Sequence, residues 1–385
     1  QRRSVSGSSR SSNHKHDLGF ISFGTLVMTI GSFIREWRAY FRFRRLPPNE
    51  KAIVFYAEDA GSWRFLEPII AHLTFTHGRS ISYITSSHVD PILEQIDERI
   101  RTFCIGFGTA RTIFFLSLKA DVMVMTMPDL GTYQIKRSYN PVRYLYVYHS
   151  INSTHMAYRR GAFDNYDQIL CVGPHHTEEI RAAEELYGLE PKILLEGGYV
   201  ILDSIIASAQ NFIATPYDGS RRILIAPSWG DEGLIESVGP ELVAVLLEAG
   251  YRVTVRPHIM TIRGRHSTLP QMQERFRSNP GFQMDLDLSS QGAVSESDIM
   301  ISDWSGAAIE YALGLEKPVI FVDVPRKINN PGYRDISYEP IEVMLRSEIG
   351  DVIPTDRLPD IPATVERLCE NPGIWRVRMR ELRER

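Results

Sequence analysis

From residue 51 onward, short apolar runs alternate with longer amphipathic stretches, and this alternation constrains the fold more than any other feature of the chain. Runs rich in Val, Ile and Tyr suit buried strands, and the stretches between them suit helices. Strands that alternate with helices predict parallel sheets covered on both faces. The predicted strands are residues 51–57, 81–85, 121–126, 144–148, 167–172, 192–195, 222–226, 251–255, 298–302 and 318–323, and helices are predicted near 63–77, 88–98, 109–119 and 175–187.

The alternation is interrupted at the turn-rich segment 215–220 and then restarts. We therefore predict an α/β protein with two doubly wound, Rossmann-like halves over residues 50–210 and 219–360, followed by a C-terminal helix over 361–385. Ligands of such sheets bind beyond the carboxyl ends of the strands, and two successive domains add a cleft between them. The residues directly after each strand are therefore the candidates for function.

Composition limits the class of protein. The 385 residues are 43% hydrophobic and 23% charged, which supports a large core and excludes a disordered chain. The three cysteines, Cys104, Cys171 and Cys369, lie far apart, which excludes a disulfide framework and a zinc cluster and suits a reducing compartment. The net charge of −4 is not the basic balance of a nucleic-acid-binding protein.

The positive charge is concentrated at the start of the chain, where residues 1–45 hold nine Lys and Arg against two acidic residues. Residues 1–17 are expected to form a disordered basic tail. The segment 18–34 is uncharged, and 35–45 alternates arginines with aromatic residues, as is typical of the lipid headgroup layer. Crossing a bilayer takes about 20 apolar residues, so a span is marginal. We expect residues 18–45 to bind the anionic cytoplasmic face of the cell membrane, peripherally or as a single anchor; the alternative is a helix packed on the protein's own body.

The strongest local pattern follows the predicted strand 298–302. Ser302, Asp303, Ser305 and Gly306 lead into an amphipathic helix that contains Glu310. Free backbone N–H groups at a helix start, with serine hydroxyls beside them, form a site for phosphate. These residues are candidates for binding a phosphate-bearing donor, and the alternative is an ordinary capped helix.

Two other strand ends of the second half carry candidate donor-binding residues. Arg256 and His258 follow the strand 251–255, where a cation and an imidazole can both face a diphosphate, although a single histidine is more often structural. After the first strand of this half, an aromatic ring and backbone amides can line a nucleotide pocket; these residues are Pro227, Ser228 and Trp229.

In the first half, His149 follows the strand 144–148 at the predicted cleft. The unperturbed pKa of histidine, about 6.5, suits a general base at neutral pH. Gly198, Tyr199 and Asp203 close this half and are candidates for a hinge.

Other chemistry is weakly represented. Asp285 and Asp287 imitate the Asp-x-Asp metal site of some glycosyltransferases, but they precede a predicted strand instead of ending one. The chain has no P-loop, no HExxH, no G-x-S-x-G and no Gly-rich dinucleotide motif, which argues against a kinase, metalloprotease, lipase or dehydrogenase. We therefore predict neither a metal nor a cofactor.

Taken together, these segments resemble the CDP-glycerol glycerophosphotransferases of teichoic acid synthesis, which have the GT-B fold. The resemblance runs from about residue 140 to 345 and depends on the order and spacing of His149, Gly198-Tyr199 with Asp203, residues 225–229, Arg256-Pro-His258, Ser302-Asp-Trp-Ser305 and residues 311–323. It implies that His149 is the base, that His258 and Ser305 contact the donor's phosphates, and that the protein works at a membrane on a lipid-linked acceptor. Ser150 stands where the family usually has Gly, Gly306 replaces the second Ser of a Ser-Ser pair, and the segment after Asp323 also departs from the family pattern.

The leading hypothesis is a membrane-associated transferase that moves a phospho-alditol group, such as glycerol phosphate, from a CDP-linked donor to a lipid-linked or polysaccharide acceptor and releases CMP. His149 and His258 are the predicted catalytic residues. One alternative is a GT-B glycosyltransferase of cell-surface polysaccharide synthesis, which would release a nucleoside diphosphate. A non-catalytic scaffold of the same fold is the other.

Overall fold

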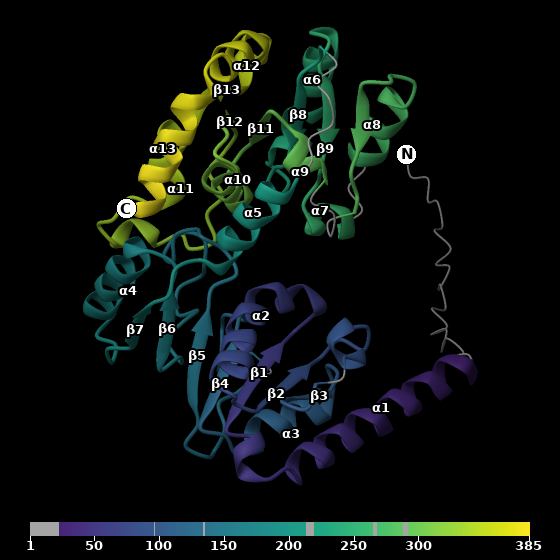
Figure 1. Cartoon of the computed structure of the whole chain (residues 1–385), viewed down its shortest axis with the longest axis vertical. Coiled ribbons are helices and arrows are strands. Elements are labelled where there is room, and N and C mark those ends of the chain that lie inside the picture. The colour runs from purple at the N-terminus through teal and green to yellow at the C-terminus, as the bar shows by residue number, and fades with distance from the viewer. Residues whose placement is uncertain (1–22, 96, 134, 213–218, 265–267, 288–291) are drawn as a thin grey trace, which may run out of the picture.

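The computed structural model describes residues 23–95, 97–133, 135–212, 219–264, 268–287 and 292–385. These residues form two parallel sheets, one in each half of the chain, each flanked by helices (Figure 1). This arrangement confirms the predicted pair of doubly wound halves. The predicted disordered tail, residues 1–17, and residues 18–22 of the predicted membrane segment lie outside the described residues.

The first sheet has seven strands in the order β3-β2-β1-β4-β5-β6-β7, all paired in parallel. Its central strand β1 is buried on both faces: Val54 and Tyr56 belong to one core cluster, and Phe55 and Ala57 belong to the other. The strands are β1 (Ile53–Ala57), β2 (Ile81–Thr85), β3 (Ile100–Cys104), β4 (Val122–Met125), β5 (Arg143–Val147), β6 (Gln168–Cys171) and β7 (Ile193–Glu196).

The second sheet has six strands in the order β10-β9-β8-β11-β12-β13, also paired in parallel. Ile223 and Ile225 face one core, whereas Leu224 faces a core shared with the first half. The strands are β8 (Arg222–Ile225), β9 (Arg252–Val255), β10 (Phe282–Met284), β11 (Ile299–Ser302), β12 (Val319–Asp323) and β13 (Gly350–Pro354).

Three strands were not predicted, and all three lie at sheet edges: β3, β10 and β13. An edge strand is partly exposed, so it does not need the continuous apolar run of a central parallel strand. β3 contains Arg101 and Thr102, and β13 contains Asp351 and ends at Pro354. Polar residues in these edge strands therefore explain why the apolar pattern misses them, whereas the edge strand β7 keeps an apolar run and was predicted.

The helices follow the prediction in most of the chain. The prediction of a helix near 88–98 was wrong. After Asp90 the chain makes only a short 3₁₀ turn, Pro91–Glu94, before β3. The C-terminal segment 361–385 contains two helices, because Pro372 starts a new one. The helices are α1 (Phe23–Arg44), α2 (Trp63–Ala71), α3 (Thr109–Ser117), α4 (Pro174–Tyr187), α5 (Val200–Asn211), α6 (Leu234–Glu248), α7 (Ile259–Arg263), α8 (Thr268–Phe276), α9 (Gly292–Glu296), α10 (Gly306–Leu315), α11 (Ile341–Met344), α12 (Ile361–Cys369) and α13 (Pro372–Glu384).

Helix α5 joins the two halves by packing against α10 of the second half (Figure 1). The approach is close, since a Cβ atom on Gly314 would lie 2.5 Å from Ile205 Cγ2. One hydrophobic cluster combines Phe65, Ile151 and Tyr199 of the first half with residues of α10 and β11. The halves are therefore in direct contact at the carboxyl ends of their strands.

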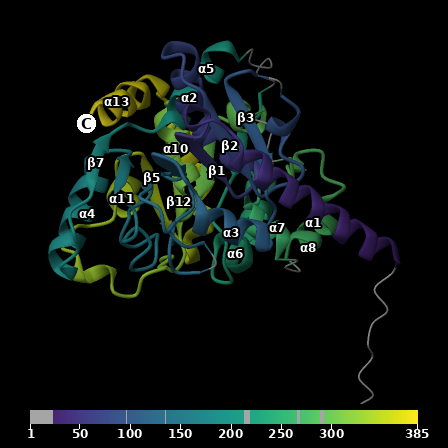
Figure 2. The same cartoon turned by 90° about the horizontal axis from the view of Figure 1, so that it is seen from below.

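Helix α1 projects along the edge of the first half, beside β3 and α3 (Figure 2). Its buried face carries Ala39, Tyr40 and Phe43, and the Phe43 ring packs on Phe103 and Phe114 at centroid distances of 5.7 and 5.0 Å. The C-terminal part of α1 thus packs on the protein's own body, which is the alternative that the sequence left open.

A polar chain also ties α1 to the first sheet. Glu36 Oε1 lies 3.1 Å from His88 Nε2, and His88 Nδ1 lies 3.2 Å from Cys104 Sγ at the end of β3. Glu36 fits closely over the loop after β3, because a Cβ atom on Gly106 would lie 2.1 Å from Glu36 Oε1. Among the residues that the structure describes, no helix is both long and apolar enough to cross a membrane.

Candidate active site

The loop after β5 in the first half meets the start of α10 in the second half. Gly306 is the first residue of α10, and a Cβ atom on it would lie 2.4 Å from Asn152 Oδ1 and 3.0 Å from Ser150 Oγ. A side chain at residue 306 would displace Asn152, so glycine permits this contact. His149 directly precedes Ser150, so the structure brings the predicted base and the predicted phosphate site to one place.

The neutral ring of His149 has its proton on Nδ1, which leaves Nε2 able to accept a proton as a base does. Its Nδ1 lies 2.9 Å from the Thr126 carbonyl oxygen, which can only accept, so Nδ1 carries the proton and Nε2 carries the lone pair. Nε2 has no hydrogen-bond partner within the described part of the chain. Burial lowers the pKa of His149 below its usual value, and the charge of Arg64 acts in the same direction. The ring is therefore neutral at neutral pH.

The start of α10 keeps the form of a phosphate site. Ser305 is the N-cap residue, and its Oγ accepts a hydrogen bond of 3.3 Å from Ala307 N. Ser302 is fully buried and donates to the Ala226 carbonyl oxygen at 2.7 Å. The hydroxyl of Ser302 therefore supports the neighbouring loop, which differs from the predicted direct contact with a donor.

Asp303 also lies beneath the loop instead of facing the cleft. Its carboxylate accepts hydrogen bonds from Ser228 N at 2.6 Å, Trp304 N at 2.7 Å and Leu234 N at 3.2 Å. It fixes the loop after β8, in which Pro227 and Ser228 are buried and Trp229 is exposed. Of the three predicted residues in this loop, Trp229 is the one with a side chain at the surface.

Trp229, His258 and Lys327 form a stacked group. The Trp229 and His258 rings lie 6.2 Å apart with an interplanar angle of 29°, and Lys327 Nζ lies 4.0 Å from the Trp229 ring centroid. His258 Nδ1 accepts a hydrogen bond from Met260 N, so Nε2 carries the proton and can donate to an anion. Burial, together with the Lys327 charge, lowers the pKa of His258 to about 4, and burial lowers the pKa of Lys327 to about 8. A neutral donor and a cation thus stand side by side.

Arg256 is held by one of the two aspartates of the predicted Asp-x-Asp pair. Its Nη1 lies 2.8 Å from Asp285 Oδ2, and both side chains are mostly buried. Because Asp285 is engaged as an ion-pair partner, a metal-binding role for it is not supported. The described residues contain no group of three or more His, Cys, Asp or Glu side chains that could hold a metal ion.

Glu310 connects the halves below the cleft. Tyr199, at the start of α5, donates a hydrogen bond of 2.6 Å to Glu310 Oε1 on α10. Burial raises the pKa of Glu310. The predicted donor-binding residue Glu310 and the predicted hinge residue Tyr199 therefore bond to each other.

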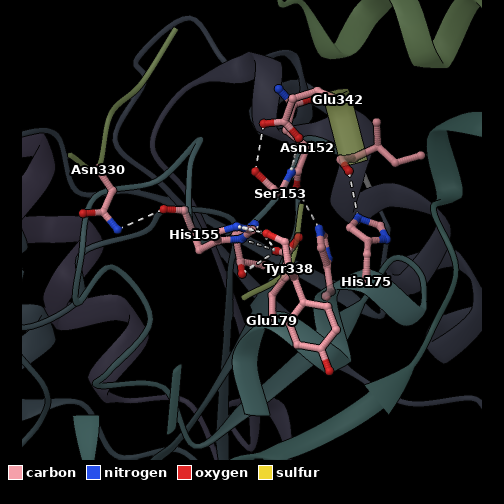
Figure 3. Close-up of polar contacts among 11 residues, drawn as sticks. Asn152, Ser153, His155, His175, Glu179, Asn330, Tyr338 and Glu342 are labelled. Atoms are coloured by element: carbon pink, nitrogen blue, oxygen red, sulfur yellow. Dashed lines mark hydrogen bonds and ion pairs between the residues drawn. The ribbon is translucent and has the colours of Figure 1, made fainter. Parts of the chain in front are cut away.

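The loop that carries His149 is also fastened to α11 of the second half (Figure 3). Ser153 donates through its backbone N to Glu342 Oε2 at 2.9 Å and through its hydroxyl to Glu342 Oε1 at 2.8 Å. Both residues are buried. The second half thus positions the loop that carries His149, the predicted base.

A second part of the same network surrounds His155, which pairs with Glu179 at 3.3 Å and bonds the Tyr338 carbonyl oxygen at 3.0 Å (Figure 3). Asn330 Nδ2 donates to the His155 carbonyl oxygen at 2.9 Å. Burial alone would lower the pKa of His155, but the Glu179 carboxylate outweighs burial and raises it. We call Ser153, His155, Glu179 and Glu342 the interdomain latch.

Sequence reasoning missed Lys327, Asn152 and the interdomain latch. Lys327 lies four residues after β12, whereas Arg256 directly follows β9, so a search limited to the first residues after each strand does not reach it. The residues of the interdomain latch form no recognisable sequence motif, because they lie up to 189 positions apart in the chain.

Residues 39–327 match the family CDP-Glycerol:Poly(glycerophosphate) glycerophosphotransferase. Comparison with curated protein sequences gives no match.

Among solved structures, the chain is similar to the wall teichoic acid polymerase TagF in a crystal soaked with CDPG, with a TM-score of 0.52, 12% identity and 92% and 93% of the two chains covered. It is also similar to UDP-GlcNAc 2-epimerase from Neisseria meningitidis, with a TM-score of 0.53, 13% identity and 85% and 93% covered. A glycosyltransferase from Rickettsia africae gives a TM-score of 0.52, 12% identity and 87% and 93% covered.

These structural similarities confirm the predicted GT-B fold. Because the sequences are only 12–13% identical, the similarities are evidence for the fold and for nothing more. The family match is independent of them and includes the loop of His149, the start of α10 and the Trp229–His258–Lys327 group. The chain belongs to the CDP-glycerol:poly(glycerophosphate) glycerophosphotransferase family.

Proposed function

We propose that this protein transfers a phospho-alditol group, such as glycerol phosphate, from a CDP-linked donor to a hydroxyl of a lipid-linked or polymeric acceptor. The observation that carries the proposal is the contact of Gly306 with Asn152 and Ser150, because it sets a neutral histidine beside the start of α10. A base from one half and a phosphate site from the other are the two parts that such a transfer requires.

The groups present suggest one division of labour. In this scheme the diphosphate binds at the start of α10, Lys327 offsets its charge, His258 donates a hydrogen bond to it, and Trp229 lines the nucleotide. The acceptor oxygen attacks the β-phosphorus, the bond from this phosphorus to the bridging oxygen breaks, and CMP leaves with that oxygen. The acceptor proton passes to Nε2 of His149.

The proposal is tested with the full chain, CDP-glycerol and a lipid-linked acceptor, by measuring CMP release and phosphate incorporation. Wild-type protein should release one CMP for each group transferred, and His149→Gln should not. UDP-sugars serve as the competing donors. Turnover of a UDP-sugar with release of UDP, and none of CDP-glycerol, would replace the proposal by glycosyl transfer.

We also propose that the outer face of α1 binds an anionic membrane surface. Ile30, Phe33 and Ile34 are about half exposed, and they lie beside the exposed Arg35 and Arg38. Each cation near an anionic surface contributes about 1 kcal/mol. Apolar side chains and arginines on one exposed helix face support peripheral attachment at the inner face of the cell membrane.

The packing of α1 decides how this membrane proposal is tested. Deleting residues 1–45 would remove Tyr40 and Phe43 from the core, so such a deletion is unsuitable. Phe33→Ser combined with Ile34→Ser changes only the exposed face and should release the protein from anionic liposomes in a flotation assay. The matched control is Phe75→Ser with Leu286→Ser, two exposed apolar residues elsewhere. Equal flotation of both double variants would contradict the proposal.

A further inference from the structure

The side chain of Asn152 has one free polar group at the point where the halves meet. Its Oδ1 accepts a hydrogen bond of 3.1 Å from Ser150 Oγ and lies against Gly306. Its Nδ2 has no hydrogen-bond partner among the described residues. The backbone N of Gly306 is likewise unpartnered within the described chain, as expected at a helix start. The Asn152 side chain and the start of α10, from opposite halves, therefore lie side by side, and each has an N–H group without a partner among the described residues.

Asn152 is held firmly in this position. Its backbone N donates to Ser150 Oγ at 3.3 Å, and its carbonyl oxygen accepts from His176 Nε2 at 2.9 Å. The residues on either side are also fixed, since Ile151 O accepts from His175 Nε2 at 3.0 Å and Ser153 is bonded to Glu342 (Figure 3). A side chain supported in this way is preorganised, which is what stabilisation of developing charge requires.

We propose that Asn152 donates a hydrogen bond from Nδ2 to the phosphoryl group being transferred, with Ser150 orienting its amide. This inference rests on the proposed function and adds a donor-contacting residue from the acceptor-binding half. Ser150 Oγ–H occupies Oδ1 of Asn152, so the amide nitrogen is the atom of this side chain that is left to donate a hydrogen bond. Gly306 has no side chain, which leaves room for this amide at the start of α10.

The first test compares nucleotides that differ by one phosphate. Asn152 is expected to contact the β-phosphoryl group, which CDP has and CMP lacks. A hydrogen bond to a charged group contributes about 1.5–3 kcal/mol, so Asn152→Ala should lower CDP affinity by at least about tenfold and leave CMP affinity unchanged. Asn152→Asp has the same shape and can still accept from Ser150, but it sets a negative oxygen against the phosphate, so it should lower CDP affinity further. Calorimetric titration gives both affinities.

The second test is a double-variant cycle with Gly306→Ala, whose methyl group would displace the amide of Asn152. Each single variant should lower the transfer rate by about 10²-fold, as the loss of one such donor does. The double variant Asn152→Ala with Gly306→Ala should be no slower than either single variant, because both remove the same hydrogen bond. Additive losses in the double variant would overturn the proposal.

A purely structural role gives a different result. If Asn152 only joins the halves, its variants lower the melting temperature and change CDP and CMP affinity equally, or change neither, and the proposal is wrong. If the protein binds UDP and UMP but not the cytidine nucleotides, the proposed function fails, and the ratio of UDP to UMP affinity then tests Asn152 in the same way.

Discussion

At the scale of single residues, the site depends on which nitrogen of each histidine carries a proton. Nδ1 of His149 donates to Thr126 O, whereas Nδ1 of His258 accepts from Met260 N. The first ring therefore has its lone pair at Nε2 and can accept a proton there, and the second can donate a hydrogen bond from Nε2. Both histidines can be selected from the sequence because each lies just after a predicted strand. Their opposite hydrogen-bonding roles follow only from the backbone groups that the fold brings to them.

His149→Gln is expected to lower the transfer rate by about 10²–10⁴-fold, because glutamine cannot take the acceptor proton. Since burial lowers the pKa of His149, the wild-type rate should rise with pH through a pKa below the usual 6.5 and be level at neutral pH. The pH dependence of kcat measures this. A rise that is still under way above neutral pH would mean that another group is the base.

Lys327 gives a second residue-scale prediction, because burial lowers its pKa to about 8. Its charge is present below that pH and is lost above it, so the affinity for CDP should fall as pH rises through about 8. Lys327→Arg keeps the charge and should remove this pH dependence. Titration of CDP at about pH 7 and about pH 9 compares the two proteins. An identical decrease in both would exclude Lys327 as the cause.

At the scale of elements, the central strands are predictable from sequence because burial on both faces leaves a continuous apolar run. Tyr144, Tyr146 and their neighbours in β5 form such a run, whereas in β3 the polar pair Arg101 and Thr102 interrupts the apolar residues. Helix α1 shows another limit: its uncharged run and its arginines are evident in the sequence, but the partners of Tyr40 and Phe43 lie more than 50 residues away.

Phe43→Ala should lower the free energy of unfolding by about 3–5 kcal/mol, because it removes a buried ring that packs on Phe103 and Phe114. Phe33→Ala on the exposed face of the same helix should change it by less than about 0.5 kcal/mol. Urea unfolding of both variants separates the two faces. Similar losses in both would show that the exposed face of α1 also packs on the protein.

At the scale of the whole molecule, the candidate active site lies where the two halves meet. The sequence predicts the halves and the strand ends that face each other, but not the bonds between them. Ser153 with Glu342, and His155 with the Tyr338 carbonyl, join segments that are more than 180 residues apart. No local pattern specifies such pairs, so the cleft was predictable and the interdomain latch was not.

The interdomain latch should make stability fall as pH rises. His155 has a raised pKa in the folded protein, so its contribution is full below the unfolded value of about 6.5 and is lost as pH rises through the folded value. Burial also raises the pKa of Glu342, which acts in the same direction. His155→Asn should flatten the melting temperature between about pH 6 and about pH 8, whereas the exposed His77→Asn should not. An unchanged pH dependence in His155→Asn would contradict this account.

Glu36 contacts His88, and His88 contacts Cys104, so the Cys104 thiol can report detachment of α1 from the first half. Burial raises the pKa of the Cys104 thiol, and the nearby Glu36 carboxylate adds to the effect, so detachment of α1 should speed its reaction with a disulfide reagent. Cys171 is buried, and burial raises the pKa of Cys369 to about 11, so both should react slowly. The labelling rate of a single thiol therefore measures, with and without liposomes, how often α1 leaves the first half.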